Sequence, residues 1–210
     1  MAPPAGPRPA RRAPPGDSGR ISHSGGPNMI LRSLFIVLTG VILMGCSNMK
    51  VTDFEGGTPE LKLEDYFLGR TEATGFFEDR FGKIRRQFIV TIDGHWDGEV
   101  LTLDEDFRYD DGSTERRLWK IRPVGERGYE GSAENVVGMA AGTRAGNAFN
   151  WRYTFDMAVG DSVWRVRFDD WMFLMPNGIL INTATVTRWG FEIGRVTLAF
   201  QRKDTPAVAE

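Results

Sequence analysis

The chain has 210 residues, with 26 lysines and arginines against 28 aspartates and glutamates. This length suits one domain with a full-sized core. The balanced charge, without a Lys/Arg-rich block, argues against binding to nucleic acid and against electrostatic docking on an anionic membrane. The single cysteine excludes a disulfide within the chain and a thiol-based metal site.

The first segment, residues 1–28, is rich in proline, glycine and arginine and has no apolar periodicity, which predicts disorder. Arg32 and the apolar run 34–44 follow in the form of an export signal. A run of this length is too short to span a bilayer, which takes about 20 apolar residues. We interpret residues 1–28 as a misassigned start and Met29 as the true first residue.

Leu43-Met44-Gly45-Cys46 has the pattern of a lipobox, in which the cysteine is acylated and becomes the first residue after cleavage. We therefore predict a lipoprotein signal peptide over residues 29–45 and acyl chains on Cys46. A cleaved secreted protein with an unmodified cysteine is the alternative. Ser47, in place of an aspartate, favours the outer membrane. The expected location is thus the bacterial cell envelope, as an outer-membrane lipoprotein facing the periplasm.

Residues 46–57 are predicted to form an acylated tether. Thr58-Pro59 resembles an N-cap followed by proline at the first helical position, which predicts a short helix through about Phe67. From Gly69 onward, apolar and polar residues alternate with the period of a half-buried strand. The predicted strands cover residues 70–77, 84–95, 101–109, 117–122, 129–142, 148–157, 162–174, 179–188 and 195–202.

About nine or ten strands joined by short turns favour an all-β fold, a single antiparallel up-and-down β-barrel or strongly curled sheet, because closure removes exposed edges. This barrel domain is expected over residues 58–204, with a disordered tail at 205–210. A short helix that leads into a meandering barrel is also similar to the lipocalin plan, by fold analogy only.

The predicted turns set the strand registers. A two-residue turn at Gly160-Asp161 places Tyr153 opposite Phe168 on the dry face and Asp156 opposite Arg165 on the wet face. Asn177-Gly178 predicts a type I′ turn.

A three-residue loop at Asp110-Asp111-Gly112 places Glu105 opposite Arg117. The same alternation puts polar groups, Asp170 among them, on the face that carries the aromatic residues. An unpaired buried charge costs several kcal/mol. One interpretation is structural, an ion pair between Glu105 and Arg117 and a hydrogen-bonded Asp170. The other is a set of polar anchors that orient the head of an amphiphilic ligand in an aromatic-lined cavity. The candidate ligand-binding residues are Glu105, Tyr109, Arg117, Trp119, Trp151, Tyr153, Phe168 and Asp170.

Trp171, Phe173 and Met175 point away from the predicted barrel interior. We expect the N-terminal helix, a partner or a membrane to cover this apolar patch. His95 is predicted to lie in a hairpin turn, and no serine near the pattern of a nucleophile elbow accompanies it. No motif for a metal or a cofactor is present, so we expect neither.

Several spaced motifs carry a resemblance to a known family. They are Glu105-x-Phe107-x-Tyr109-Asp110-Asp111-Gly112, Arg117-x-Trp119, Tyr129-x-Gly131-x-Ala133, Val137-Gly138-x-Ala140-x-Gly142, Asp169-Asp170-Trp171-Met172, Asn182 and Trp189-Gly190. From the tether to about Arg202, the chain resembles the bacterial family catalogued as domain of unknown function 3833. The resemblance implies a lipoprotein, in agreement with Cys46, and assigns no catalytic residues.

Three functional hypotheses follow. The first is a non-enzymatic binder or carrier of a lipid or other apolar ligand, attached to the membrane through Cys46, with no nucleic acid partner. The second is a structural or accessory envelope protein that acts through the patch at Trp171, Phe173 and Met175. The third is an acid/base enzyme on a lipid substrate that uses Asp170 and Glu105.

Overall fold

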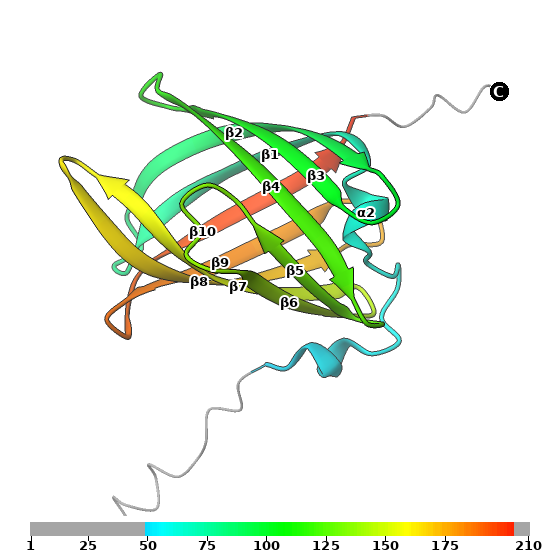
Figure 1. Cartoon of the computed structure of the whole chain (residues 1–210). Helices are drawn as coiled ribbons and strands as arrows, with labels where there is room; N and C mark the ends of the chain where they lie inside the picture. The colour runs from blue at the N-terminus through cyan, green and yellow to red at the C-terminus, as the bar shows by residue number, and fades with distance from the viewer. Residues whose placement is uncertain (1–48, 204–210) are drawn as a thin grey trace, which may run out of the picture. The chain divides into compact units, whose positions relative to one another are not determined.

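A computed structural model describes residues 49–203 as a closed barrel of ten antiparallel strands (Figure 1). The strands are β1 (Gly69–Asp79), β2 (Ile84–Trp96), β3 (Leu101–Tyr109), β4 (Thr114–Val124), β5 (Gly128–Ser132), β6 (Ala140–Ala145), β7 (Ala148–Val159), β8 (Ser162–Leu174), β9 (Leu180–Arg188) and β10 (Phe191–Arg202). Each strand pairs with its neighbours in sequence, and β1 pairs with β10 to close the barrel. The prediction of an all-β up-and-down barrel is confirmed.

Two short helical segments precede the barrel, the 3-10 turn η1 (Val51–Phe54) and the helix α2 (Leu63–Tyr66). None of the helices in the described part of the chain is long and apolar enough to cross a membrane. The predicted leader, the signal peptide, Cys46 and the tail at 205–210 all lie outside the described residues.

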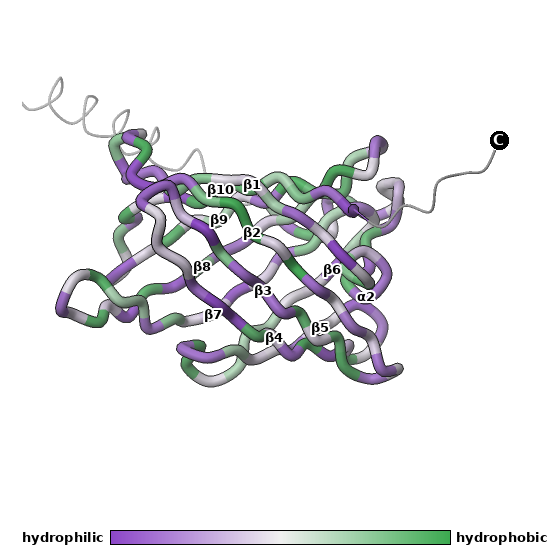
Figure 2. Tube along the Cα trace, turned by 90° about the horizontal axis from the view of Figure 1, so that it is seen from above, coloured by the Kyte–Doolittle hydropathy of each residue, from purple (hydrophilic) through white to green (hydrophobic). Residues whose placement is uncertain are grey.

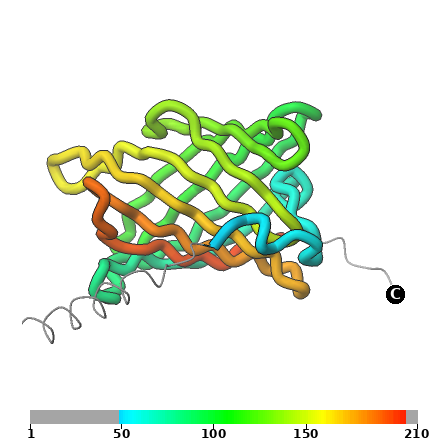
Figure 3. The backbone as a smooth tube through the Cα atoms, turned by 90° about the horizontal axis from the view of Figure 1, so that it is seen from below, coloured from blue at the N-terminus to red at the C-terminus, as the bar shows by residue number. Residues whose placement is uncertain are grey.

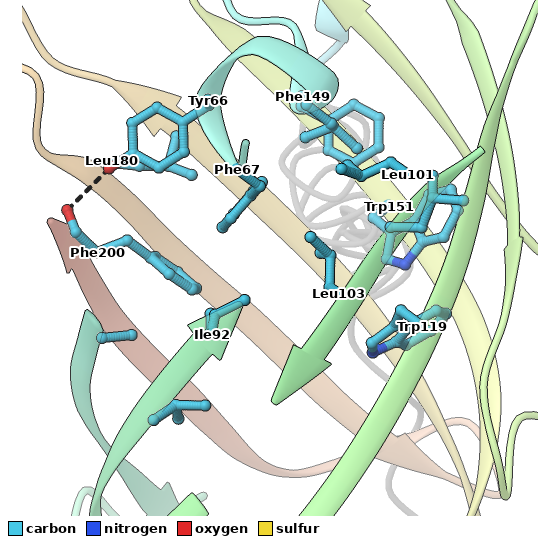
Figure 4. Packing of buried hydrophobic residues seen from close by; sticks show 14 of the residues in the cluster. Tyr66, Phe67, Ile92, Leu101, Leu103, Trp119, Phe149, Trp151, Leu180 and Phe200 are labelled. Atoms are coloured by element: carbon cyan, nitrogen blue, oxygen red, sulfur yellow. Dashed lines mark hydrogen bonds between the residues drawn. The ribbon is translucent and has the colours of Figure 1, made fainter. Parts of the chain in front are cut away.

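The segment around α2 plugs one end of the barrel. Tyr66 and Phe67 are buried there with Leu61 and Leu63. The Tyr66 hydroxyl lies 3.0 Å from the carbonyl oxygen of Phe200, and the Phe67 ring meets the Phe200 ring edge-on at 5.6 Å (Figure 4). The strands alternate in direction, so every second connection lies at the opposite, open end (Figure 1). These connections are β1–β2, β3–β4, β5–β6, β7–β8 and β9–β10.

The predicted first residue of the helix is wrong. The peptide from Thr58 to Pro59 is followed by extended chain, and α2 begins only at Leu63. A tertiary hydrogen bond competes with the predicted cap, because the backbone N–H of Leu61 donates to the carbonyl oxygen of Gly146 at 2.9 Å. That N–H is therefore bound to the β6–β7 turn and is not available to the Thr58 side chain, which was the predicted N-cap.

Two further local predictions need correction. The single strand expected over 129–142 is divided into β5 and β6, because the N–H of Val137 donates to the Thr154 carbonyl and binds the intervening loop to β7. The turn at Asn177-Gly178 is not type I′, since only Gly178 has positive φ, at 79°. Pro176 has no N–H to close a two-residue loop, so a three-residue loop forms instead.

The predicted register of the β7–β8 hairpin is confirmed. Tyr153 pairs with Phe168, and their rings stack at 4.9 Å with an interplanar angle of 4°. On the outer face, Arg165 donates to Asp156 at 2.8 Å. The alternation of hydrophilic and hydrophobic residues along the strands is visible in Figure 2. This period-two pattern therefore separates a dry inner wall from a wet outer wall.

The N-terminal segment lies across the outer wall (Figure 3). The Phe54 ring is 6.2 Å from the Trp171 ring and 5.1 Å from the Phe173 ring, while Met175 stays exposed. Glu55 also pairs with Arg127 at 2.5 Å. Part of the segment predicted as a tether thus packs on the barrel and covers two of the three patch residues.

Candidate functional site

The barrel encloses a cavity of about 940 Å³. It extends from Leu63 and Phe67 at the plugged end to Ser113 and Val163 at the open end. The eight residues that the sequence singled out for ligand binding all line this cavity, namely Glu105, Tyr109, Arg117, Trp119, Trp151, Tyr153, Phe168 and Asp170. The patch residues Trp171, Phe173 and Met175 do not line it.

Aromatic side chains form one wall of the cavity. The Trp119 ring on β4 lies 5.9 Å from the Trp151 ring on β7 (Figure 4). It lies 5.3 Å from the ring of Tyr153, also on β7. These strands are separated by β5 and β6, which are short and carry glycines on their inner face. A Cβ on Gly142 would come within 2.5 Å of the Trp151 ring. The missing side chains therefore make room for the tryptophan.

Four polar side chains from four strands meet within this aromatic lining. They are Glu105 on β3, Arg117 on β4, Tyr153 on β7 and Asp170 on β8. Burial raises the pKa of each of the other three, and the positive charge of Arg117 opposes that rise in all of them, so the guanidinium is their common neighbour. Strand pairing positions the first two, because Glu105 and Arg117 are directly opposite in the β3–β4 ladder.

Arg117 does not form the expected ion pair with Glu105 but pairs with Glu115 instead. Among the described residues, Arg117 donates to Glu115 at 2.6 Å, and no ion pair joins it to Glu105. The guanidinium also lies 4.8 Å from the Phe107 ring and 4.9 Å from the Phe155 ring. Glu115 lies two residues before Arg117 on the same face of β4, and the long arginine side chain reaches it there.

Sequence reasoning missed Glu115, although it alternates in step with Arg117 and Trp119. The Tyr109 hydroxyl donates to its carboxylate at 2.8 Å, and Arg86 lies 3.5 Å over the Tyr109 ring. Burial favours the protonated acid, but Arg117 and Tyr109 outweigh it and lower the pKa of Glu115. The carboxylate of Glu115 thus already binds Arg117, on the side of the cluster that faces the open end of the barrel.

Asp170 and Arg117 each keep an unsatisfied atom in this cluster. Asp170 is 7% exposed, and its Oδ1 has no hydrogen-bond partner among the described residues. The Nε of Arg117 is likewise buried without a partner there. Buried polar atoms are nearly always hydrogen-bonded in native structures, so such atoms call for an explanation, for example a ligand or water in the cavity.

The carboxyls of the cluster titrate far from their ordinary range. Burial raises the pKa of Asp170 from 3.8 to about 8, with a further increase from the neighbouring charge of Asp169. Burial raises the pKa of Glu105 from 4.5 to about 7, although Arg117 opposes the increase. Near neutral pH, these two groups therefore exchange protons readily and can either accept or donate a hydrogen bond.

Metal chemistry finds no support in the described part of the chain, where no group of histidine, cysteine, aspartate and glutamate could hold a metal ion. The strand predicted over 84–95 ends one residue later, at Trp96, so His95 lies within β2 with an exposed side chain and not in the hairpin turn, which follows at Asp97. The strand continues to Trp96 because the β2–β3 ladder extends to the pair of Trp96 and Leu101.

Fold and cavity together define a class, the lipocalin-like β-barrels with an aromatic-lined interior that opens at one end. The chain belongs to the family described as "Protein of unknown function (DUF3833)", which matches residues 40–202. Among solved structures, the S-type phycobiliprotein lyase CPES from Guillardia theta is similar, with a TM-score of 0.52 and 10% identity over 76% of this chain and 95% of that chain. At this identity the likeness shows the fold alone. A search of curated proteins found no match.

Proposed function

We propose that the protein is a non-enzymatic binder or carrier of an amphiphilic molecule, which it holds inside the barrel. The apolar body of the ligand lies against the aromatic wall, and its polar head meets Glu105, Arg117 and Asp170. The observation that carries this proposal is a cavity of about 940 Å³ in which Asp170 Oδ1 and Arg117 Nε have no partner within the described residues. Ligand sites typically have volumes of about 300–1,000 Å³ and a few convergent polar groups.

The charges favour a head group with a cationic or donor-rich part that meets the two acids, together with an acceptor oxygen for the Arg117 Nε–H. Glu115 already binds Arg117, whereas Glu105 and Asp170 form no ion pair among the described residues. A positive head would stabilise their ionised forms and also interact with the faces of the surrounding rings. A carboxylate head would instead meet two acids beside an arginine that is already occupied.

The proposed location rests on the lipobox at 43–46 and on Ser47. Residues 51–57 pack on the barrel, so only the chain from Cys46 to Lys50 would link the acyl chains to the body. Five residues reach at most about 18 Å when fully extended, which would keep the barrel beside its membrane. Metabolic labelling with an alkyne fatty acid should mark the wild type and leave Cys46→Ser unlabelled. Equal labelling of both would contradict the lipid anchor.

Ligand binding is tested with probes of one chain length and three heads. Full-length protein with Cys46→Ser is titrated with dodecylamine, dodecanol and dodecanoate while tryptophan fluorescence is followed. We expect the amine to bind at least tenfold more tightly than the carboxylate, and Asp170→Asn to reduce this preference. Glu130→Gln is the matched control, because Glu130 pairs with Arg122 on the outer wall and does not line the cavity. Failure of all three probes to bind would refute the cavity binder, whereas equal binding would refute only the head-group preference.

An acid/base enzyme remains the second candidate, because pKa values of about 7 and about 8 are typical of catalytic acids and bases. Lipids extracted from the bacterial envelope can be incubated with the protein and compared by mass spectrometry. Recovery of the bound lipid unchanged supports the carrier. A chemically altered product that Asp170→Asn no longer forms would establish the enzyme instead.

The accessory-protein hypothesis has weaker support, because Phe54 covers Trp171 and Phe173 and leaves Met175 as the exposed member of the patch.

A further inference from the structure

Two hairpins at the open end of the barrel lie side by side. The β1–β2 hairpin and the β9–β10 hairpin are neighbours because β1 pairs with β10 (Figures 1 and 3). The backbone N–H of Arg80 donates to the carbonyl oxygen of Ile193 at 3.2 Å, which joins the two loops. Phe81 comes from the first hairpin, and Trp189 and Phe191 come from the second. We call these three residues the aromatic lip.

The lip consists of large apolar side chains that the barrel leaves in solvent. Phe81 is 79% exposed, Trp189 is 81% exposed and Phe191 is 71% exposed. None of them contributes to the core clusters of the described residues. Isolated exposed apolar residues are common, but three exposed aromatic residues on two adjacent hairpins at the end of a cavity indicate an interaction site.

The backbone conformation at Trp189 is independent evidence that the exposed ring has a function. Arg188 pairs with Phe191, so the loop between them has two residues, Trp189 with φ 53° and Gly190 with φ 85°. Asparagine, aspartate and glycine normally fill such positions, and a bulky residue with positive φ is a genuine outlier. Strain of this kind persists mainly at functional sites.

Positive charge accompanies the rings. The guanidinium of Arg80 lies 4.7 Å over the Phe81 ring, and that of Arg188 lies 4.1 Å over the Trp189 ring. The ion pairs of this region use Arg85 with Asp79 and Arg195 with Glu192. Within the described residues, three cations of the two hairpins have no carboxylate at ion-pair distance, namely Arg80, Lys83 and Arg188.

The overall charge of the chain argues against docking through net charge, but the fold places cations that have no ion pair among the described residues beside exposed rings. We propose that the aromatic lip docks the open end of the barrel on an anionic lipid bilayer. The three rings enter the boundary between head groups and acyl chains, and Arg80, Lys83 and Arg188 bind lipid phosphates. Aromatic rings beside lysine and arginine are the chemistry of the membrane interface. The cavity begins just inside, since Phe77 lines it four residues before Phe81. Docking goes beyond the proposed ligand binding and does not depend on it.

The test uses full-length protein with Cys46→Ser, so that no acyl chain contributes. Flotation with phosphatidylcholine vesicles, with and without phosphatidylglycerol, measures docking. We expect binding to the anionic vesicles, at least tenfold weaker binding to phosphatidylcholine alone, and weakening by salt because the Debye length shortens. The double variant Phe81→Ser with Trp189→Asn should lose at least tenfold in affinity, and Arg80→Gln with Lys83→Gln should lose the preference for anionic lipid.

A matched control removes exposed apolar residues from the outer wall. Ile89 and Leu118 are 39% and 44% exposed there, and the double variant Ile89→Ser with Leu118→Ser should float as the wild type does. Circular dichroism checks that each variant is folded. The inference is overturned if folded lip variants bind vesicles as tightly as the parent Cys46→Ser protein, or if that parent protein does not bind. It is also overturned if sedimentation shows that the lip holds two copies of the chain together instead.

Discussion

Replacement of Asp170 by asparagine should make the protein more stable, and increasingly so as the pH rises. Asparagine keeps the size and polarity of the protonated carboxyl but cannot ionise. Burial raises the pKa of Asp170 from 3.8 to about 8. Between these two values the unfolded chain has released the proton while the folded protein retains it. The free energy of unfolding of the wild type therefore falls as pH rises through this window and levels off above it.

The magnitude follows from the two pKa values. The difference of about 4 pH units corresponds to about 6 kcal/mol at about 1.36 kcal/mol per unit. Between about pH 5 and pH 8, the wild type should lose about 4 kcal/mol relative to Asp170→Asn. A domain of this size gains about 2–4 °C in Tm per kcal/mol, so the two Tm values should diverge by about 8–16 °C.

The other groups that face Asp170 are the same in both proteins, namely Glu105, Arg117, Tyr153 and Asp169. Their titration therefore largely cancels from the difference between the two Tm values.

Thermal unfolding followed by circular dichroism at several pH values measures this difference. Asp156→Asn serves as the control. Arg165 holds the pKa of Asp156 below its usual range, so that carboxylate contributes stability above its unfolded pKa and loses it as pH falls. Its substitution should show no growing advantage at high pH. Parallel curves of Tm against pH for the wild type and Asp170→Asn would refute the argument that the cavity strongly disfavours the ionised carboxylate.

Three further substitutions test other parts of the structure. Gly142→Ala should destabilise by about 1–3 kcal/mol in chemical denaturation, because the new Cβ would lie 2.5 Å from the Trp151 ring; an unchanged midpoint would contradict this packing. Tyr66→Phe removes the hydroxyl that lies 3.0 Å from the Phe200 carbonyl and should lower stability by about 1 kcal/mol, with faster amide exchange at the plugged end. Trp189→Asn should raise Tm slightly while it weakens vesicle binding, since asparagine tolerates positive φ at a cost about 1 kcal/mol lower; a clear loss of stability would show that the ring supports the fold.

Much of the fold could be predicted from local patterns. The alternation along Tyr153 and Phe155 assigns these residues to the inner wall, and the Gly160-Asp161 turn fixes the register that pairs Tyr153 with Phe168. The same alternation brought Glu105 and Asp170 into the cavity lining. These successes share a physical reason, because the side-chain period of a strand and the chemistry of a tight turn are set by neighbours along the chain.

The features that depend on closure of the barrel could be learned only from the tertiary structure. The pairing of Thr71 with Arg202 joins the two ends of the sheet, and no local signal encodes it. Closure sets the distances across the interior, and with them the cavity and the raised pKa of Asp170. It also decides that Arg117 binds Glu115 rather than Glu105. Hairpins distant in sequence become neighbours in the same way, so Arg80 and Lys83 of one hairpin lie at the same end of the barrel as Trp189 of the other. Alternation assigns each residue to a face, whereas the neighbours it meets there depend on strands far away in the chain.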